Sequence, residues 1–343
     1  MPVFAVTISV GRMPVTVARG GVRFDGRVST SPYSDLERPP LNEKTLGRLL
    51  VRPGSLWREI QVVPETGSTN ADLVALAGKG APEGSVLVAE VQTAGRGRLD
   101  RAWSAPPRSG LMFSMLLRPA EAGVTAARLG WLPLLTGVAV AAAVRKFTAR
   151  GRSGRFSALA DLGEPGEANG GGVDGNVLDA RLKWPNDVLV GERKLAGILA
   201  EQADSGIVVG VGLNVSLHAD ELPVPSATSL AIEGAAFTDR EPLLRAILRE
   251  FETWYSAWCT VMGDPEADVP DGYPVVSGIP VSESIEGGLR QAYKNLSATL
   301  GREVRAELPG GRTISGTALD VDGSGCLVVG DQALSAGDVI HVR

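Results

Sequence analysis

The chain has 343 residues, of which 44% are hydrophobic and 5% aromatic, and it carries a formal net charge of −5 at pH 7. This length allows one large domain and a small one, with a core built mainly from Ala, Val and Leu. The negative charge argues against binding of nucleic acid through overall charge. Two cysteines and two histidines exclude a disulfide framework and a cysteine-based zinc site, and they disfavour a histidine-rich metal site.

Residues 1–36 are rich in Gly, Pro, Ser and Arg and have no sustained hydrophobic period, so we expect a poorly ordered extension. The apolar run 3–10 lacks the flanking pattern of a signal peptide. The apolar segment 131–144 is too short for a membrane span and has Arg128 and Arg145 on either side. We therefore expect a cytoplasmic protein with no membrane partner.

Segment 37–261 alternates helical and strand patterns, as an α/β (α+β) domain does. In the turn Gly67-Ser68-Thr69-Asn70, Thr69 is the expected N-cap of a helix, and Asp72 is placed to complete a capping box. Further helices are expected at 42–50, 132–147 and 239–258, and strands at 59–63, 85–90, 111–117, 181–184 and 207–211.

Two Gly-rich segments interrupt this pattern. Residues 151–175 include 8 glycines, and we expect a flexible insertion at about 151–180. A second insertion is expected at 262–288. Beyond it, residues 289–343 should form a small all-β barrel of SH3-like size, because short strands alternate with Gly-rich turns. The expected strands are 304–308, 313–321, 326–329, 332–335 and 339–342.

The first candidate site is an arginine–glycine loop. Arg96, Arg98 and Arg101 lie within six positions, and Gly95 and Gly97 allow the backbone to bend close to a ligand. Guanidinium groups at this density suit phosphate oxygens, which they grip in a forked geometry. The loop lacks the spacing of a P-loop. A solvated basic loop, or an Arg-Gly element that binds nucleic acid, would account for it equally well.

The second candidate is the segment Lys183-Trp184-Pro185-Asn186-Asp187. It should end a strand and turn sharply, which is where α/β proteins place catalytic groups. A turn around a buried tryptophan would explain Pro185 and Asn186, but it gives no reason for Lys183 and Asp187.

Several further polar residues also have a structural reading. Lys194 stands before the apolar run 195–199, where it could extend along the surface toward water or face a carboxylate. Ser68, Thr69 and Asn70 suit helix capping. The segment Gly210-Val211-Gly212-Leu213-Asn214 would by itself be a strand that leads into a turn.

Taken in this order, the segments resemble those of the biotin–protein ligase family, also called biotin–[acetyl-CoA-carboxylase] ligases or holocarboxylase synthetases. The resemblance runs from about Leu41 to Arg343, broken by the two Gly-rich segments. It implies a class II synthetase-like mixed sheet flanked by helices, with a C-terminal SH3-like barrel. It also implies two half-reactions, in which biotin and Mg-ATP give biotinyl-AMP and a carrier lysine then takes the biotinyl group.

Position by position, the resemblance implies the following roles. Biotin would be bound by Ser68, Thr69, Asn70, Gln92, Arg96, Gly97, Arg98 and Lys194. The nucleotide would be bound by Arg98, Arg101, Trp103, Asn186 and Asn214. Asp100 departs from the family pattern, which often has Gly there, so we expect altered ordering of the loop or altered ATP affinity.

The chemistry agrees with these roles. A carboxylic acid with a pKa near 4 to 5 is already ionised, so its adenylation needs charge neutralisation rather than a base. We expect Arg96, Arg98, Lys183 and Lys194 to supply it together with Mg²⁺, although no protein ligand for the metal is assigned. The carrier lysine must lose a proton before it attacks. Asp187 is the candidate that orients or deprotonates it.

The resemblance implies a carrier domain of acetyl-CoA, acyl-CoA or pyruvate carboxylase as the partner. Residues 1–40 lack the periodicity of a helix-turn-helix, so we expect no binding of nucleic acid. The nearest competing function is that of a lipoate or octanoate ligase or transferase of related fold. Two more distant possibilities are a nucleic-acid-binding protein that uses the arginine–glycine loop and the barrel, and a catalytically silent relative.

Overall fold

The computed structural model describes residues 6–10, 13–18, 21–23, 38–152, 175–204, 206–268, 288–308 and 310–342. It divides into two compact units, Met1–Pro39 and Pro40–Arg343. In the first unit, β1 (Val6–Val10), β2 (Met13–Ala18) and β3 (Gly21–Arg23) pair antiparallel in chain order. These strands lie within residues 1–36, for which the sequence predicts a poorly ordered extension. That extension and its boundary stay predictions.

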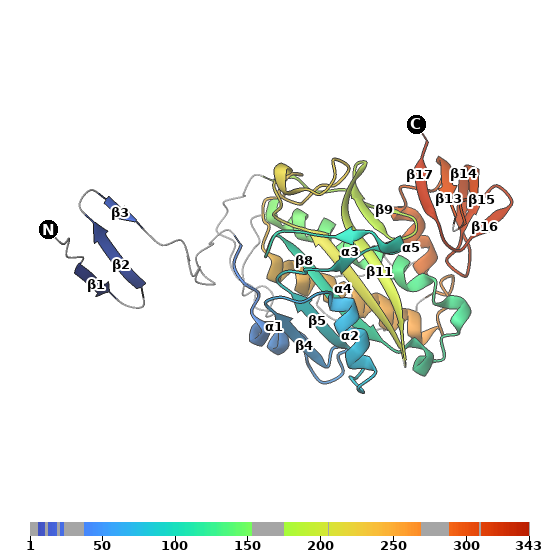
Figure 1. Cartoon of the computed structure of the whole chain (residues 1–343). Helices are drawn as coiled ribbons and strands as arrows, with labels where there is room; N and C mark the ends of the chain where they lie inside the picture. The colour runs from blue at the N-terminus through green and yellow to red at the C-terminus, as the bar shows by residue number, and fades with distance from the viewer. Residues whose placement is uncertain are drawn as a thin grey trace. The chain divides into compact units, whose positions relative to one another are not determined.

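The second unit is organised by a seven-stranded mixed sheet (Figure 1). The strand order is β4-β5-β8-β12-β11-β10-β9; β4 and β5 are parallel and all other neighbours are antiparallel. The bounds are β4 (Glu59–Val63), β5 (Ser85–Ala89), β8 (Gly110–Leu117), β9 (Ala180–Lys183), β10 (Asp187–Val190), β11 (Arg193–Ala203) and β12 (Gly206–Asn214).

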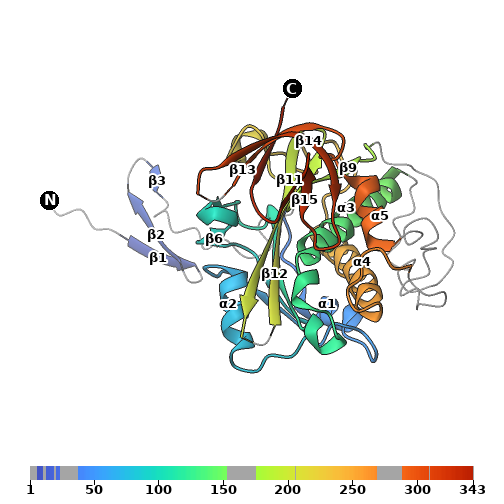
Figure 2. The ribbon, with the colours of Figure 1, turned by 90° about the vertical axis from the view of Figure 1, so that its right-hand side faces the viewer.

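Helices cover the two faces of this sheet unequally, as the view in Figure 2 shows. Helix α2 (Thr69–Ala77) packs on one face over a small apolar cluster. On the other face, α3 (Trp131–Arg152) and α4 (Arg240–Thr260) pack against each other and over the main core. Helix α1 (Glu43–Leu50) contacts β4 and α4. Because α2 is short, the described residues leave part of its face of the sheet for a cavity.

Helix α3 is apolar for a structural reason. In the part of the chain that the structure describes, its residues Trp131–Ala149 form one segment long and apolar enough to cross a membrane, and most of this segment is buried inside the protein. The helix begins one residue before the predicted start and continues past the predicted end at 147. Burial on several sides explains why its sequence shows little polar face.

The C-terminal part of the second unit is a separate sheet of five strands. The five antiparallel strands have the order β16-β15-β14-β13-β17, which agrees with the predicted small β domain. They are β13 (Glu303–Glu307), β14 (Thr313–Val321), β15 (Leu327–Val329), β16 (Gln332–Leu334) and β17 (Asp338–His341). Helix α5 (Gly288–Leu296) precedes them and was not expected from the sequence. The two predicted insertions fall largely on 153–174 and 269–287, outside the described residues.

The C-terminal sheet is tied to the main sheet through Trp184. The backbone nitrogen of Trp184 donates to Thr299 Oγ1 at 3.1 Å, and its indole Nε1 donates to the carbonyl of Gly325 at 3.1 Å. Arg128 Nη1 also donates to the carbonyl of Gly323 at 2.6 Å. These bonds hold the turn between β14 and β15, and the segment before β13, next to the turn that follows β9.

One local prediction was wrong. The N-cap of α2 is Ser68, whose side chain accepts from the backbone nitrogen of Ala71 at 3.5 Å, and Thr69 is already helical. Asp72 accepts a hydrogen bond from Thr66 Oγ1 instead of completing a capping box at Thr69. Both Ser and Thr are good caps, so the local sequence does not decide between them. The shift places the Thr69 side chain inside the protein.

A buried ion pair joins α4 to the end of β5. Arg240 Nη1 lies 2.6 Å from Glu90 Oε2, and the two side chains are only 4% and 7% exposed. Glu90 Oε1 also accepts from the backbone nitrogen of Leu41 at 2.6 Å. Removing one member of such a pair leaves a buried charge without its partner.

We therefore expect Arg240→Met to lower the free energy of unfolding by about 3 kcal/mol. The control is Lys146→Met, which breaks the more exposed pair with Glu250 and should cost about 1 kcal/mol or less. Urea unfolding followed by circular dichroism measures both. Equal losses for the two variants would contradict the special role of the buried pair.

Candidate functional site

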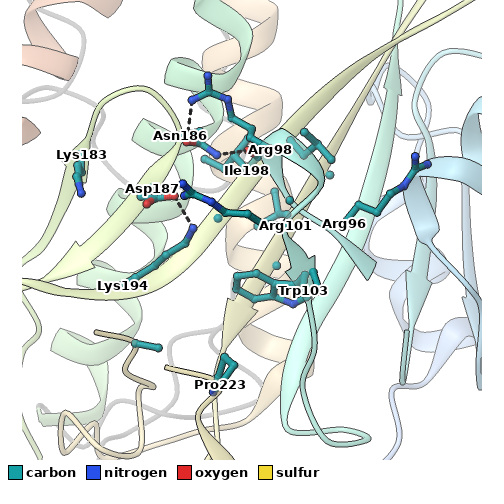
Figure 3. Close-up of a pocket in the computed structure, with 18 of the residues that line it drawn as sticks. Arg96, Arg98, Arg101, Trp103, Lys183, Asn186, Asp187, Lys194, Ile198 and Pro223 are labelled. Carbon is teal, nitrogen blue, oxygen red and sulfur yellow. Dashed lines mark hydrogen bonds and ion pairs between the residues drawn. The ribbon is translucent and has the colours of Figure 1, made fainter. Parts of the chain in front are cut away.

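A cavity of about 690 Å³ opens on the α2 face of the main sheet. It lies between the first turn of α2, the glycines of β11 and β12, the hairpin formed by β6 (Gly95–Arg96) and β7 (Ala102–Trp103), and β17 of the C-terminal sheet. Figure 3 shows part of its lining, with charged side chains gathered around one region. Residues far apart in the sequence therefore share one space.

The floor of this cavity is polar and is hydrogen-bonded to the protein behind it. Thr69 donates from its backbone nitrogen and from Oγ1 to Gln92 Oε1, at 2.8 and 3.0 Å. Ser114 Oγ on β8 lies 2.7 Å from Thr69 Oγ1 and 2.6 Å from Asn70 Oδ1. Ser68, Thr69 and Asn70 are all buried. We call Ser68, Thr69, Asn70 and Gln92 the polar floor.

Two glycines of β12 let side chains lie directly on the sheet. A Cβ atom at Gly210 would stand 2.0 Å from Asn70 Oδ1, and one at Gly212 would stand 2.4 Å from Cε2 of Trp103. Any larger residue would displace the amide or the indole ring. The glycines of the 210–214 segment are therefore required by close approach rather than by a turn.

Trp103 forms a flat wall of the cavity above β12. The Lys194 Nζ atom lies 5.9 Å from the centroid of its ring. Its indole Nε1 is buried and has no hydrogen-bond partner among the described residues. An aromatic face beside a cation, with an unused donor at its edge, suits a planar polar ligand.

Positive side chains form the rim of the cavity, around Asp187. Lys194 Nζ lies 2.6 Å from Asp187 Oδ1. Arg98 Nη1 donates to Asn186 Oδ1 at 3.4 Å and to the carbonyl of Gly337 at 3.3 Å, the latter from the C-terminal sheet. We call Arg98, Arg101, Lys183 and Lys194 the cationic rim (Figure 3).

Partial burial makes these cations costly to keep charged. Desolvation lowers the pKa of Arg98 and of Lys183, and the nearby Asp187 carboxylate opposes this lowering in both. Lys194 lowers the pKa of Lys183 further, and Arg101 lowers the pKa of both groups. Arg101 itself pairs with Asp338 of β17. A bound anion would offset both the mutual repulsion of these cations and the free-energy cost of their desolvation.

The loop between β6 and β7 carries an unusual backbone. Leu99, within the short 3₁₀ segment Arg98–Asp100, has φ of 54° and a side chain that is 61% exposed. A left-handed non-glycine residue and an exposed leucine both cost free energy in isolation. The backbone and the exposure of Leu99 therefore indicate a loop whose conformation serves binding of a ligand rather than the stability of the fold.

The structure brings all the predicted site residues to one cavity. Those that line it are Ser68, Thr69, Asn70, Gln92, Arg96, Gly97, Arg98, Arg101, Trp103, Lys183, Asn186, Asp187, Lys194 and Asn214. Two are turned to partners elsewhere. Arg96 points away from the rim and its Nη2 lies 3.8 Å from Glu201 Oε1, while Asn214 Nδ2 donates to the carbonyl of Thr228 at 2.8 Å.

The C-terminal sheet contributes to this cavity, although no site residue was predicted there from the sequence. Glu307, Asp338 and Ile340 line it, although they lie more than a hundred residues beyond the loop and floor motifs. It also missed Ser114 and Glu201, which stand behind the polar floor. The only signal for Ser114 was a hydroxyl inside an otherwise apolar buried strand.

Comparisons with known proteins identify the family to which this chain is similar. Residues 62–217 match the profile of the Biotin/lipoate A/B protein ligase family, and residues 299–342 match that of the Biotin protein ligase C terminal domain. The chain is 40% identical over 314 residues to the biotin–[acetyl-CoA-carboxylase] ligase of Mycobacterium tuberculosis, covering 90% of this chain and 98% of that relative. It is 28% identical to the bifunctional ligase/repressor BirA of Bacillus spizizenii, over 77% of this chain and 67% of the relative.

Solved structures support the fold. The biotin protein ligase of Aquifex aeolicus in complex with biotin and ATP superposes with a TM-score of 0.57 at 24% identity, covering 84% of this chain and 100% of that chain. The predicted fold class is confirmed by this likeness together with the observed mixed sheet and C-terminal β domain. The chain therefore belongs to the Biotin/lipoate A/B protein ligase family, and within it to the biotin protein ligases that carry the C-terminal domain.

Proposed function

We propose that this protein is an ATP-dependent ligase that attaches biotin to a lysine of a carboxylase carrier domain through a biotinyl-AMP intermediate. The observation that carries the proposal is the single cavity in which the polar floor, the ring of Trp103 and the cationic rim meet. A ligase of this type must hold a small acid and a nucleotide side by side. The similarity to biotin–[acetyl-CoA-carboxylase] ligases points to the same pair of substrates.

The polar floor would take the ring of biotin. A cyclic urea offers N–H donors and a carbonyl acceptor, and the floor offers hydroxyl and amide groups to both. The dithiolane ring of lipoate and the chain of octanoate offer neither, so they would leave buried polar groups of the floor without partners. This favours biotin over lipoate or octanoate as the substrate. Lys194 and Arg98 would then face the carboxylate end of the acid.

In the first half-reaction, a carboxylate oxygen attacks the α-phosphorus of ATP and the bond to the bridging oxygen of pyrophosphate breaks. The obstacle is the approach of two anions, so the rim cations Arg98, Lys183 and Lys194 lower the barrier by neutralising charge. Arg101 would hold phosphate, which requires it to leave Asp338. Trp103 would pack against adenine, and Asn186 and Asn214 would contact the nucleotide.

Mg²⁺ would arrive with ATP, as part of the substrate. Among the described residues no three His, Cys, Asp or Glu side chains gather in a way that could hold a metal ion. We propose that phosphate oxygens and water bind this ion, as they commonly bind Mg²⁺.

In the second half-reaction, the amine of the carrier lysine attacks the acyl carbon of biotinyl-AMP and AMP leaves. The amine must first give up a proton. Asp187 would orient this amine or accept its proton, and Lys194 beside it would steady the acyl oxygen. The partner would be the carrier domain of an acetyl-CoA or acyl-CoA carboxylase, or that of pyruvate carboxylase.

We further propose that residues 37–261 form the catalytic domain and residues 289–343 the C-terminal domain, with insertions at about 151–180 and 262–288. The enzyme would work in the cytoplasm, without nucleic acid or membrane. Packing within the main core explains the apolar sequence of helix α3.

A single-turnover assay tests the proposed function. The purified chain with labelled ATP, Mg²⁺ and biotin should form biotinyl-AMP and pyrophosphate, and lipoate in place of biotin should give at most a trace. Adenylate formed from lipoate but not from biotin would favour a lipoate ligase. Failure with both acids would overturn the proposal.

Asp187→Asn tests the role of this carboxylate in transfer. The variant should slow transfer to a carrier domain by about 100-fold, within the range for general acid–base groups, and slow adenylate formation less, through the weakened hold on Lys194. Pre-formed biotinyl-AMP separates the two steps in a quenched-flow experiment. Equal losses in both steps would remove the assigned role.

A further inference from the structure

Behind the polar floor stands a carboxylate that the proposed function does not use. Glu201 lies on β11, and its Oε2 accepts a hydrogen bond from Asn70 Nδ2 at 2.7 Å. The carbonyl of Leu199 on the same strand accepts from the same nitrogen at 3.2 Å. The Glu201 side chain is 29% exposed, so its charge is partly shielded from water.

These two acceptors fix which way the Asn70 amide faces. A carboxylate and a backbone carbonyl only accept, so the NH₂ group of Asn70 must face them and its Oδ1 must face the opposite side. There Oδ1 meets Ser114 Oγ at 2.6 Å. Because Asn70 Oδ1 has no proton, the single proton of Ser114 is donated to it.

The orientation continues to the cavity through Thr69. The Ser114 proton is committed to Asn70, and Thr69 Oγ1 has two oxygens within reach for its own proton: Ser114 Oγ at 2.7 Å and Gln92 Oε1 at 3.0 Å. Thr69 therefore donates its hydroxyl proton to an oxygen of the protein, and its Oγ1 can only accept a hydrogen bond from a ligand in the cavity. Gln92 Oε1 faces the backbone nitrogen of Thr69, so the NH₂ group of Gln92 remains available as a donor.

We propose that Glu201 is a positioning residue that sets the hydrogen-bond polarity of the polar floor, acting through Asn70 and Ser114 on Thr69. This inference rests on the proposed function, because its ligand is the biotin ring. An acceptor at Thr69 beside a donor at Gln92 selects a ring that carries an N–H group and a carbonyl together. Glu201 thus contributes to the choice of a cyclic urea over a dithiolane ring without touching the ligand.

A carboxylate suits this position better than a neutral acceptor. Hydrogen bonds to a charged group are stronger than neutral ones, so Glu201 holds the amide firmly against the pull of a bound ligand. Glu201 also lies near Arg96 of the β6–β7 hairpin, which turns away from the cationic rim (Figure 3). The 3.8 Å separation and the half-exposed guanidinium make that pair a minor contribution.

The test compares Glu201→Leu, Glu201→Gln and the control Gln202→Leu, which alters the exposed neighbour on the other face of β11. Titration calorimetry measures the dissociation constants of biotin and of ATP for each. We expect Glu201→Leu to weaken biotin about tenfold, the loss of a charged hydrogen bond, and to leave ATP unchanged. Glu201→Gln keeps an acceptor for Asn70 and should stay within about threefold of the parent chain, as should Gln202→Leu.

A double-mutant cycle with Thr69→Val separates positioning from a general effect on packing. If Glu201 acts through the Thr69 hydroxyl, the tenfold loss should shrink to about twofold or less in the Thr69→Val background. Additive losses, an unchanged biotin affinity in Glu201→Leu, or an equal loss in Glu201→Gln would overturn the inference. Absence of biotin binding by the parent chain would overturn the proposed function and this inference with it.

Discussion

The constraint on which the site depends is the gathering of Arg98, Arg101, Lys183 and Lys194 at the rim of one partly buried cavity. Cations at this density repel each other and lose hydration, and the lowered pKa values of Arg98 and Lys183 express both costs. In the protein alone, Asp187 and Asp338 offset part of this charge. Glu192 and Glu307 also line the cavity, and Glu192 raises the pKa of Lys183. Under the proposed function, the carboxylate of the acid and the triphosphate of ATP would neutralise the remaining positive charge. The cavity is in this sense preorganised for the approach of two negative groups.

The fold leaves an open cavity beside α2, and the cationic rim lies around it. Among the described helices, α2 alone packs on its face of the main sheet, so the strands beside it are open. The glycines at 210 and 212 let Asn70 and Trp103 lie on the sheet surface. The C-terminal sheet closes the far side of the cavity through β17 and is held there by Trp184. In this chain the C-terminal sheet is therefore part of the cavity wall, because Asp338 and Gly337 contact the arginine–glycine loop.

Much of the site could be predicted from the sequence, because short motifs preserve residue types whose chemistry is readable. The helices α1 to α4 and most strands of the main sheet followed from hydrophobic period, whereas α5 and the strands β1 to β3 did not. The motif residues do meet at one cavity. The N-cap of α2 was misplaced because Ser68 and Thr69 are equally suitable there. The pairing of Arg101 with Asp338 spans 237 positions, so no local pattern could indicate it. Glu201 was overlooked for a similar reason, since only its contact with Asn70 distinguishes it from any charged strand residue.

Under the proposed function, the polar floor and the cationic rim are two halves of one site for a single small acid. A crystal structure with biotin bound tests this most directly, because it reports which end of the ligand meets which half. We expect the urea of biotin against Thr69 and Gln92, with its carboxylate toward Lys194. A ring placed at the rim, or a molecule bound outside this cavity, would contradict it.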